Sequence, residues 1–333
     1  MSNLLPGLSI AAVLAICAYG LEATLSIPLM VSALVLGLGV HHMRLSKAFD
    51  AGIEFAARSV LRFGVALLGA GITIQQIAAL GLTASALAVS GVGLTLACGV
   101  FVAKLLKADR DAGFIYGGAV AICGASAAMA ISSALPDTER NRATTALAVV
   151  GVTVLSTIAM LLYPMVSHAL GMDEQSAGVF FGAAIHDVAQ VVGAGYMVSD
   201  TAGETATIVK LIRVACLVPV VACVGWIALR QNDGASEAFG NDQKRPAILP
   251  WFLVGFLALS VIASADLLSQ NALQGMSAAA KALLVAAIAA LGCKTSIASL
   301  VRIGAKPVLM LSVPTLCLAV FVVGALLVAP SQF

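Results

Sequence analysis

Long apolar stretches separated by short polar links run along almost the whole chain. A bilayer core needs roughly 20 apolar residues for each helical crossing, and proline or glycine stands at most of the breaks. The pattern therefore predicts about eleven transmembrane helices. Their expected ranges are about 7–21, 25–43, 59–80, 83–103, 113–135, 144–168, 177–199, 205–229, 248–267, 279–300 and 307–329.

Composition agrees with this pattern. Of the 333 residues, 61% are hydrophobic and only 10% are charged, whereas a soluble domain has roughly 45–50% apolar and about 25% charged residues. Lipid must therefore cover most of the surface. The polar stretch 230–246 is too short for a domain. We expect one all-α integral membrane domain over 1–333, and we expect no nucleic-acid partner.

The basic residues predict an orientation. Most lie in loops near 44–58, 104–110, 230–245 and 302–306, which eleven helices would place on one side. The opposite loops hold only Arg140 and Arg142. Because Lys and Arg concentrate in cytoplasmic loops, we expect the N-terminus inside and the C-terminus outside a bacterial cytoplasmic membrane. The first apolar stretch has no basic residue before it, so we expect it to remain as a helix rather than act as a secretory signal.

Eleven helices divide into one extra helix, about 7–21, and two sets of five. The sets cover about 25–168 and about 177–329, and they would begin on opposite sides of the membrane. Two five-helix units of opposite orientation, with crossed discontinuous helices, are the inverted-repeat plan of many secondary transporters.

Charged residues inside the apolar stretches are the first candidates for function. Lys210, Arg213 and Lys294 lie deep, Arg62 lies nearer an end, and Asp187 is the one clear acid at mid-depth. A charge at the helix centre costs about 3 kcal/mol, so a surplus of cations would be relieved by a bound anion. The alternative is that each cation reaches the interface or binds backbone carbonyls.

The segment GAAIHDVAQVVGAGY, at 182–196, concentrates polar groups in an apolar helix. His186 and Gln190 share one helix face, and Asp187 lies beside them. Such groups need partners or a wet cavity at this depth, and a histidine could carry a coupling proton. The alternative is a purely structural polar cluster. No second His or Cys stands at ligand spacing, so we expect no metal.

Two other segments, 117–130 and 291–296, are rich in small and polar residues that permit a helix to unwind around a cavity. We expect these two breaks to meet and to bind an anion at half-helix N-termini. The alternative for the first break is a tight packing face of small residues. The candidate binding residues in the two breaks are Cys123, Gly124, Ser126, Lys294, Thr295 and Ser296.

Several long motifs resemble the YeiH family of sulfate export transporters. They are AICGASA at 121–127, IHDVAQVVGAG at 185–195, IVKLIRVACLVP at 208–219, PWF at 250–252, and AALGCKTSIASLVRIGAKPVLM at 289–310. The likeness covers the chain from about residue 25 to its C-terminus. That family resembles the larger group of bile-acid symporters and cation/proton antiporters, which implies crossed broken helices, a core and a scaffold, and a homodimer.

These features favour a secondary transporter for a small inorganic or organic anion, exporting sulfate or a related oxyanion or sulfonate. The alternatives are a cation/proton antiporter that uses Asp187 and a membrane sensor without transport. No nucleotide motif, metal cluster or nucleophile elbow is found, so an enzyme is not expected, and neither is a cofactor.

Overall fold

In the computed structural model the described residues are 4–25, 27–42, 46–231, 250–265, 267–294 and 304–329. They form helices joined by short links, and no strand occurs among them, which confirms the expected all-α class. The helices are α1 (Leu5–Leu25), α2 (Leu29–His42), η1 (Lys47–Phe49), α3 (Asp50–Phe55), η2 (Ala56–Val60), α4 (Leu61–Leu68), η3 (Gly69–Gly71), α5 (Ile74–Ala79), α6 (Gly81–Leu105), α7 (Arg110–Ala121), α8 (Ala125–Ser133), α9 (Glu139–Ala169), α10 (Glu174–Ala184), α11 (Val188–Val198), α12 (Asp200–Ala215), α13 (Leu217–Gln231), α14 (Trp251–Ser264), α15 (Gln270–Lys294) and α17 (Ala305–Val328).

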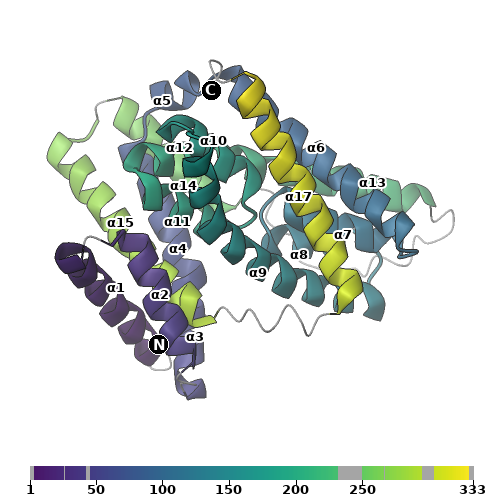
Figure 1. Ribbon diagram of the computed structural model, residues 1–333, viewed down its shortest axis with the longest axis horizontal. Coiled ribbons are helices and arrows are strands. Elements are labelled where there is room, and N and C mark those ends of the chain that lie inside the picture. The colour runs from purple at the N-terminus through teal and green to yellow at the C-terminus, as the bar shows by residue number, and fades with distance from the viewer. Residues whose placement is uncertain are drawn as a thin grey trace.

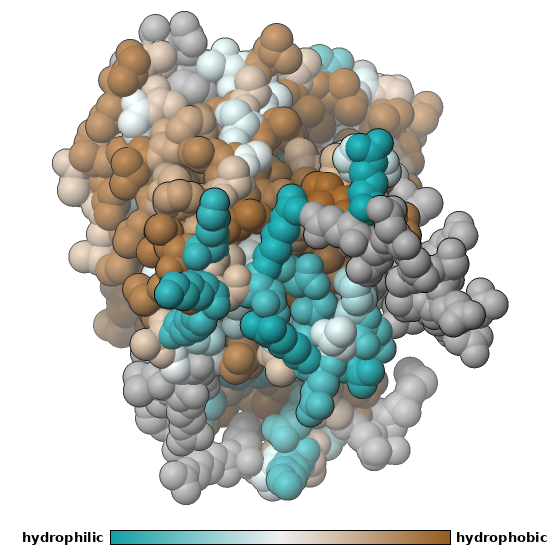
Figure 2. Space-filling model, turned by 90° about the vertical axis from the view of Figure 1, so that its right-hand side faces the viewer, coloured by the Kyte–Doolittle hydropathy of each residue, from teal (hydrophilic) through white to brown (hydrophobic). Residues whose placement is uncertain are grey.

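The outer surface is apolar enough for lipid. Six helical stretches among the described residues are long and apolar enough to cross a membrane, and α12 with α13 counts as one of them. Large apolar side chains such as Leu82, Leu316 and Val320 are 64–85% exposed. Figure 2 shows polar side chains gathered over one part of the surface, with apolar side chains over much of the rest. The chain is therefore a membrane protein with several transmembrane helices.

The helices pack as two groups (Figure 1). In the first group, α15 packs against α1, α2, η2 and α4, and α14 packs against α4. In the second group, α6 packs against α7 and α17, α12 packs against α10 and α11, and α9 packs against α7, α8 and α11. The main packing between the groups is that of α11 on α2 and α15. A narrow interface of this kind permits one group to move against the other.

The second group contains a helical hairpin made of α7 and α8. Arg140 at the start of α9 forms an ion pair with Asp109 just before α7. Beside it, Asn141 Nδ2 donates a hydrogen bond to Asp111 Oδ2 at 3.1 Å. The chain therefore enters through α7 and returns through α8 to the end from which it came.

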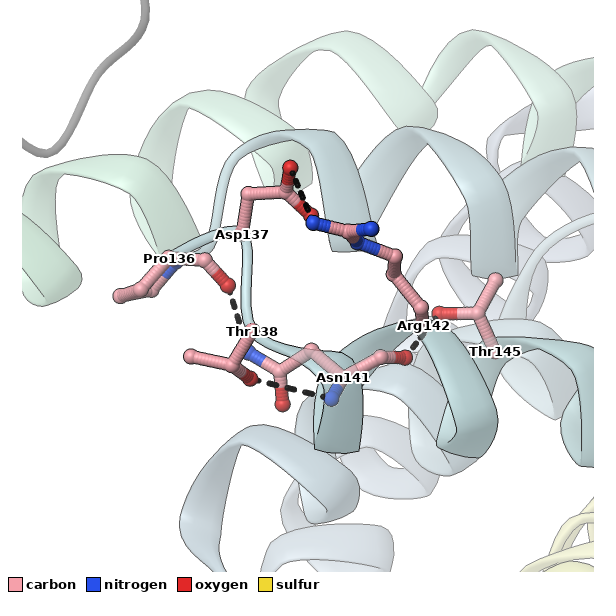
Figure 3. A network of polar contacts seen from close by, with 6 residues as sticks. All are labelled: Pro136, Asp137, Thr138, Asn141, Arg142 and Thr145. Atoms are coloured by element: carbon pink, nitrogen blue, oxygen red, sulfur yellow. Dashed lines mark hydrogen bonds and ion pairs between the residues drawn. The ribbon is translucent and has the colours of Figure 1, made fainter.

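A polar turn fixes the return of this hairpin (Figure 3). Arg142 donates from Nε and Nη2 to the two carboxylate oxygens of Asp137, at 2.7 and 3.1 Å. Asn141 Nδ2 donates to the carbonyl of Pro136 at 2.9 Å, and its backbone N–H donates to Thr138 Oγ1 at 3.1 Å. These bonds cap the start of α9 and hold the end of α8 beside it.

A second hairpin, made of α10 and α11, enters from the other end of α9. Gly178 on α10 and Gly195 on α11 both pack against the backbone of Ala202, near the start of α12. The outer ends of the two half-helices thus lie at one level. Lys210 and Arg213 reach the hairpin tip from further along α12, about 12–17 Å from Ala202 at 1.5 Å per residue.

These hairpins correct the eleven-span prediction. Ranges 113–135 and 177–199 were expected to cross the membrane, but each folds back on itself. The half-helices have only 9–12 residues, which is about 14–18 Å and too short for a core of about 30 Å. Consequently α9 runs opposite to the predicted direction, and Arg140 lies with the basic residues that precede α7. A hydropathy pattern measures the length of an apolar stretch and does not register the turn inside it.

Candidate functional site

The tips of the two hairpins meet inside the second helix group. Gly124 has φ +67° and ψ −125°, a conformation that favours glycine, and a Cβ built on it would lie 3.8 Å from the Cβ of Asp187. His186 Nδ1 lies 3.1 Å from the carbonyl oxygen of Val120. The two sequence segments at 117–130 and 182–196 are therefore neighbours, although the first was expected to meet 291–296 instead.

Lys210 joins the two tips from α12. Its side chain is fully buried, and Nζ donates to the carbonyl of Ile122 at 2.6 Å and to that of Ile185 at 2.8 Å. One ammonium group thus satisfies a carbonyl from each hairpin. Because both partners are acceptors from backbone at a helix end, the contact serves the fold of the tips.

Arg213, one helical turn further along α12, also forms hydrogen bonds to both hairpin tips. Its side chain is 1% exposed. Its guanidinium donates to Val120 and Ala121 of the first hairpin at 2.5–2.9 Å. It also donates to Gly182 and Ile185 of the second hairpin, at 3.1 and 2.9 Å. A planar group with five donors suits this set of carbonyls.

These bonds bear on the two sequence interpretations of the buried cations, and an anion-binding role of either side chain stays a prediction. Lys210 and Arg213 bind the carbonyl ends of α7 and α10, as the alternative interpretation supposed, and neither lines the cavity described below. Each helix C-terminus carries about half a negative charge. Lys210 and Arg213 together carry two positive charges, whereas the two helix C-termini that they cover carry about one negative charge. The region where the two hairpin tips meet therefore keeps a net positive charge.

His186 and Gln190 are both fully buried. His186 Nε2 lies 3.0 Å from Thr315 Oγ1 on α17, so both ring nitrogens have partners. Gln190 Nε2 donates to Thr157 Oγ1 at 3.3 Å, and its Oε1 has no partner among the described residues. Neither side chain lines the cavity. Their place is structural in this conformation, and a role of His186 in proton coupling stays a prediction.

A cavity of about 350 Å³ lies between the hairpin tips and the first helix group. Of the residues singled out in the sequence, Cys123, Ser126 and Asp187 line it. The opposite wall comes from η2, α4 and the start of α14, and a third side comes from the junction of α12 and α13. The cavity thus lies where the two groups face each other.

The cavity meets the N-termini of two half-helices that differ. Asp187 caps α11, because its Oδ1 accepts the backbone N–H of Ala189 at 3.3 Å. The N-cap of α8 is Gly124, and no side chain caps that helix. Ser126 in its first turn lines the cavity. The positive end of α8 therefore faces the cavity without a side-chain cap, and Asp187, which caps α11, lies beside it.

Arg62 is a cavity residue that the sequence interpretation did not place in the site. It was expected near a helix end, and it lines the cavity. It lies about 18 Å along the continuous helical segment from Asp50 and makes no hydrogen bond or ion pair within the described residues. Arg58, one turn earlier, lies in the π-helical segment η2 and pairs with Glu54 at 2.5 Å. Two arginines four residues apart in an apolar stretch are the signal that could have identified this wall.

Lys294 lies away from the cavity. It ends the unbroken helix α15 and forms an ion pair with Glu54, and its side chain is 39% exposed. The helix is continuous up to Lys294, and the rest of the expected break at 291–296 lies outside the described residues. Lys294 does not line the cavity at the first hairpin. Thr295 and Ser296 lie outside the described residues.

No group of three His, Cys, Asp or Glu side chains in the described part of the chain is placed to hold a metal ion.

Comparisons with known proteins all point to one family of membrane proteins. A family model described as "Conserved hypothetical protein 698" matches residues 6–311. The chain is 44% identical over 322 residues to the UPF0324 membrane protein TauZ of Paracoccus pantotrophus, covering 96% of this chain and 94% of the relative. It is 42% identical over 321 residues to a UPF0324 membrane protein of Rhizobium meliloti (96% and 92%). It is 41% identical over 321 residues to another from Chlorobaculum tepidum (96% and 88%).

Proposed function

The chain belongs to the YeiH-like UPF0324 family of membrane proteins, and from this premise we propose that it is a secondary transporter that carries a small anion. One observation carries the proposal. The uncapped N-terminus of α8 and the unpaired Arg62 face the same cavity, at membrane depth, from the two helix groups. A helix N-terminus and a guanidinium both favour an anion.

This arrangement is costly without a ligand. An arginine within a membrane needs a partner or water, and the partly buried Arg62 makes no hydrogen bond or ion pair within the described ranges, although its charge interacts with that of Asp187. The nearest acid in the cavity, Asp187, already caps α11. An anion between Ser126 and Arg62 would compensate both positive groups. Cavity residues from both helix groups would then hold the cargo.

The interface between the groups supports alternating access. On the far side from the cavity, Lys281 of α15 pairs with Asp200 of α12 at 2.6 Å, and the pair links the two groups. Opening this pair while the cavity closes would expose the same site to the other side. Two hairpins that enter from opposite ends also suit the inverted plan expected from the sequence, although the five-helix repeats themselves remain a prediction.

The finer proposals follow from the sequence. The cargo would be sulfate or a related oxyanion or sulfonate, exported through a bacterial cytoplasmic membrane. The N-terminus would lie inside and the C-terminus outside, and two copies would form a homodimer. Proton coupling through His186 is part of the same proposal.

One observation favours the cation/proton antiporter as second candidate, because Asp187 lines the cavity. A carboxylate is the usual carrier for a proton or Na⁺ in a membrane. The nearby N-terminus of α8 and Arg62 oppose a second cation there, so we place the anion first.

The test is transport by the purified protein in liposomes. Uptake of radiolabelled sulfate and of a radiolabelled sulfonate is measured with and without a pH gradient. Arg62→Gln should reduce anion flux about tenfold to hundredfold, since a charge-assisted hydrogen bond contributes about 1.5–3 kcal/mol. Arg230→Gln is the matched control, because Arg230 stacks on Trp226 and lies outside the cavity.

Equal flux in wild type and Arg62→Gln would reject Arg62 as the anion ligand. Proton-driven Na⁺ flux without any anion flux would favour the antiporter. A pH dependence of anion flux that is lost in His186→Gln would support coupling through this residue.

A further inference from the structure

The residues that line the cavity indicate which class of anion it can bind, provided that the proposed function holds. We propose that the cargo is an organic monoanion, with one acidic head and a short apolar tail, rather than an inorganic dianion. Three independent features of the cavity lead to this assignment: its polarity, its charge and its size.

The cavity has a few polar groups between walls that are mostly apolar. Ser126 and Asp187 lie at the hairpin tips, and Arg58 and Arg62 lie on the wall that faces them. Most of the other lining side chains carry no hydrogen-bonding group, and they include Leu61, Val65, Met129, Val214, Leu217 and Phe252. A sulfate ion has four oxygens that need partners when water is removed. The apolar walls offer it none, whereas a hydrocarbon tail gains by contact with them.

The charges in the cavity leave room for about one negative charge. Arg58 shares Glu54 with Lys294, and its side chain is 57% exposed, so solvent screens its charge. Arg62 is the free cation, and the uncapped N-terminus of α8 adds about half a positive charge. Asp187 contributes a carboxylate to the same cavity, and the N-terminus of α11 that it caps offsets about half of this negative charge. A second negative charge on the cargo would meet this carboxylate rather than a cation.

The volume also exceeds what a small inorganic ion fills. The cavity measures about 350 Å³. This value lies at the lower end of the range of about 300–1,000 Å³ for pockets that enclose organic ligands. An acid with a tail of a few carbon atoms would contact the apolar walls as well as the polar groups.

The experiment measures binding to the full chain in lipid nanodiscs by calorimetry. The probes are the sodium salts of sulfate, methanesulfonate, propane-1-sulfonate and propane-1,3-disulfonate, with empty nanodiscs to subtract partition into lipid. We expect propane-1-sulfonate to bind about tenfold more tightly than methanesulfonate, because two methylenes are buried. The disulfonate and sulfate should bind more weakly than propane-1-sulfonate.

Variants test whether the apolar cavity walls cause the tighter binding of the longer sulfonate. Met129→Gln should remove most of the gain from the tail, so that propane-1-sulfonate binding weakens more than methanesulfonate binding. Met165→Gln is its control, because Met165 lies on α9, is 68% exposed and is not part of the cavity. Arg62→Gln should weaken both sulfonates alike.

The outcomes separate this inference from the proposed function. If sulfate binds as tightly as propane-1-sulfonate and depends on Arg62, the tail assignment is wrong and the anion transporter stands. A tail gain that persists unchanged in Met129→Gln overturns the assignment of the wall. If no probe binds, or binding ignores Arg62, the proposed anion site itself fails.

Discussion

The two hairpins have the same kind of contacts at the C-terminus of their first half-helix and different contacts at the N-terminus of their second. In both, the carbonyls at the C-terminus of the first half-helix bind Lys210 and Arg213. At the second half-helix, Asp187 caps α11, but nothing comparable caps α8. The chain therefore compensates both negative poles and one of the two positive poles. The pole that it leaves open is the one that faces Arg62 across the cavity.

The largest expected effect comes from the shared end. Arg213→Gln removes five donor contacts from two hairpin tips and leaves buried carbonyls unsatisfied. At about 1–3 kcal/mol for each orphaned group, the tips should come apart. We expect little or no monodisperse protein in size-exclusion chromatography, whereas Arg230→Gln should behave as wild type. A variant that folds and melts normally but loses anion binding would restore Arg213 as a ligand, as the sequence first suggested.

The next effect tests the open tip. Gly124→Ala forces a residue with a Cβ into φ +67°, which costs about 1–3 kcal/mol of backbone strain. The added Cβ meets nothing closer than 3.6 Å, so a steric clash is not the cause. We expect the melting temperature to fall by several degrees and anion affinity to fall with it. Gly39→Ala is the control, because its Cβ would meet open space. An unchanged melting temperature would show that the tip relaxes freely.

Sequence and structure agree on the parts that depend on local composition. The apolar stretches become helices, and the breaks at Gly124 and Asp187 lie where small and polar residues accumulate. The pairing of the breaks was not predictable in this way, because it depends on chain direction. That direction is set by contacts distant in sequence, such as Arg140 with Asp109.

The misplaced cations have a related cause. Hydropathy gives the depth of a charged residue but not its partner. Lys210 and Arg213 bind backbone carbonyls that are free to accept only because a helix ends beside them. Lys294 forms an ion pair with Glu54, which is distant in sequence. Arg62 forms no hydrogen bond or ion pair among the described residues, so the proposed anion site lies at the cation that the sequence pattern ranked lower.

The smallest effect is the most discriminating, because it concerns the cap that distinguishes the two hairpins. Asp187→Asn keeps an oxygen that can accept from Ala189, and Asn caps helices about as well as Asp. The fold should therefore persist with an unchanged melting temperature. Removal of one negative charge from the cavity should raise anion affinity by about threefold to tenfold, since a like charge nearby typically opposes binding by 1 kcal/mol or so at high effective dielectric. Calorimetry with propane-1-sulfonate and with propane-1,3-disulfonate measures this, and the dianion should gain more. If Asp187 carries a proton or Na⁺ instead, the same variant should abolish transport while anion affinity stays as it was. That result would exchange the roles of the two hairpin tips.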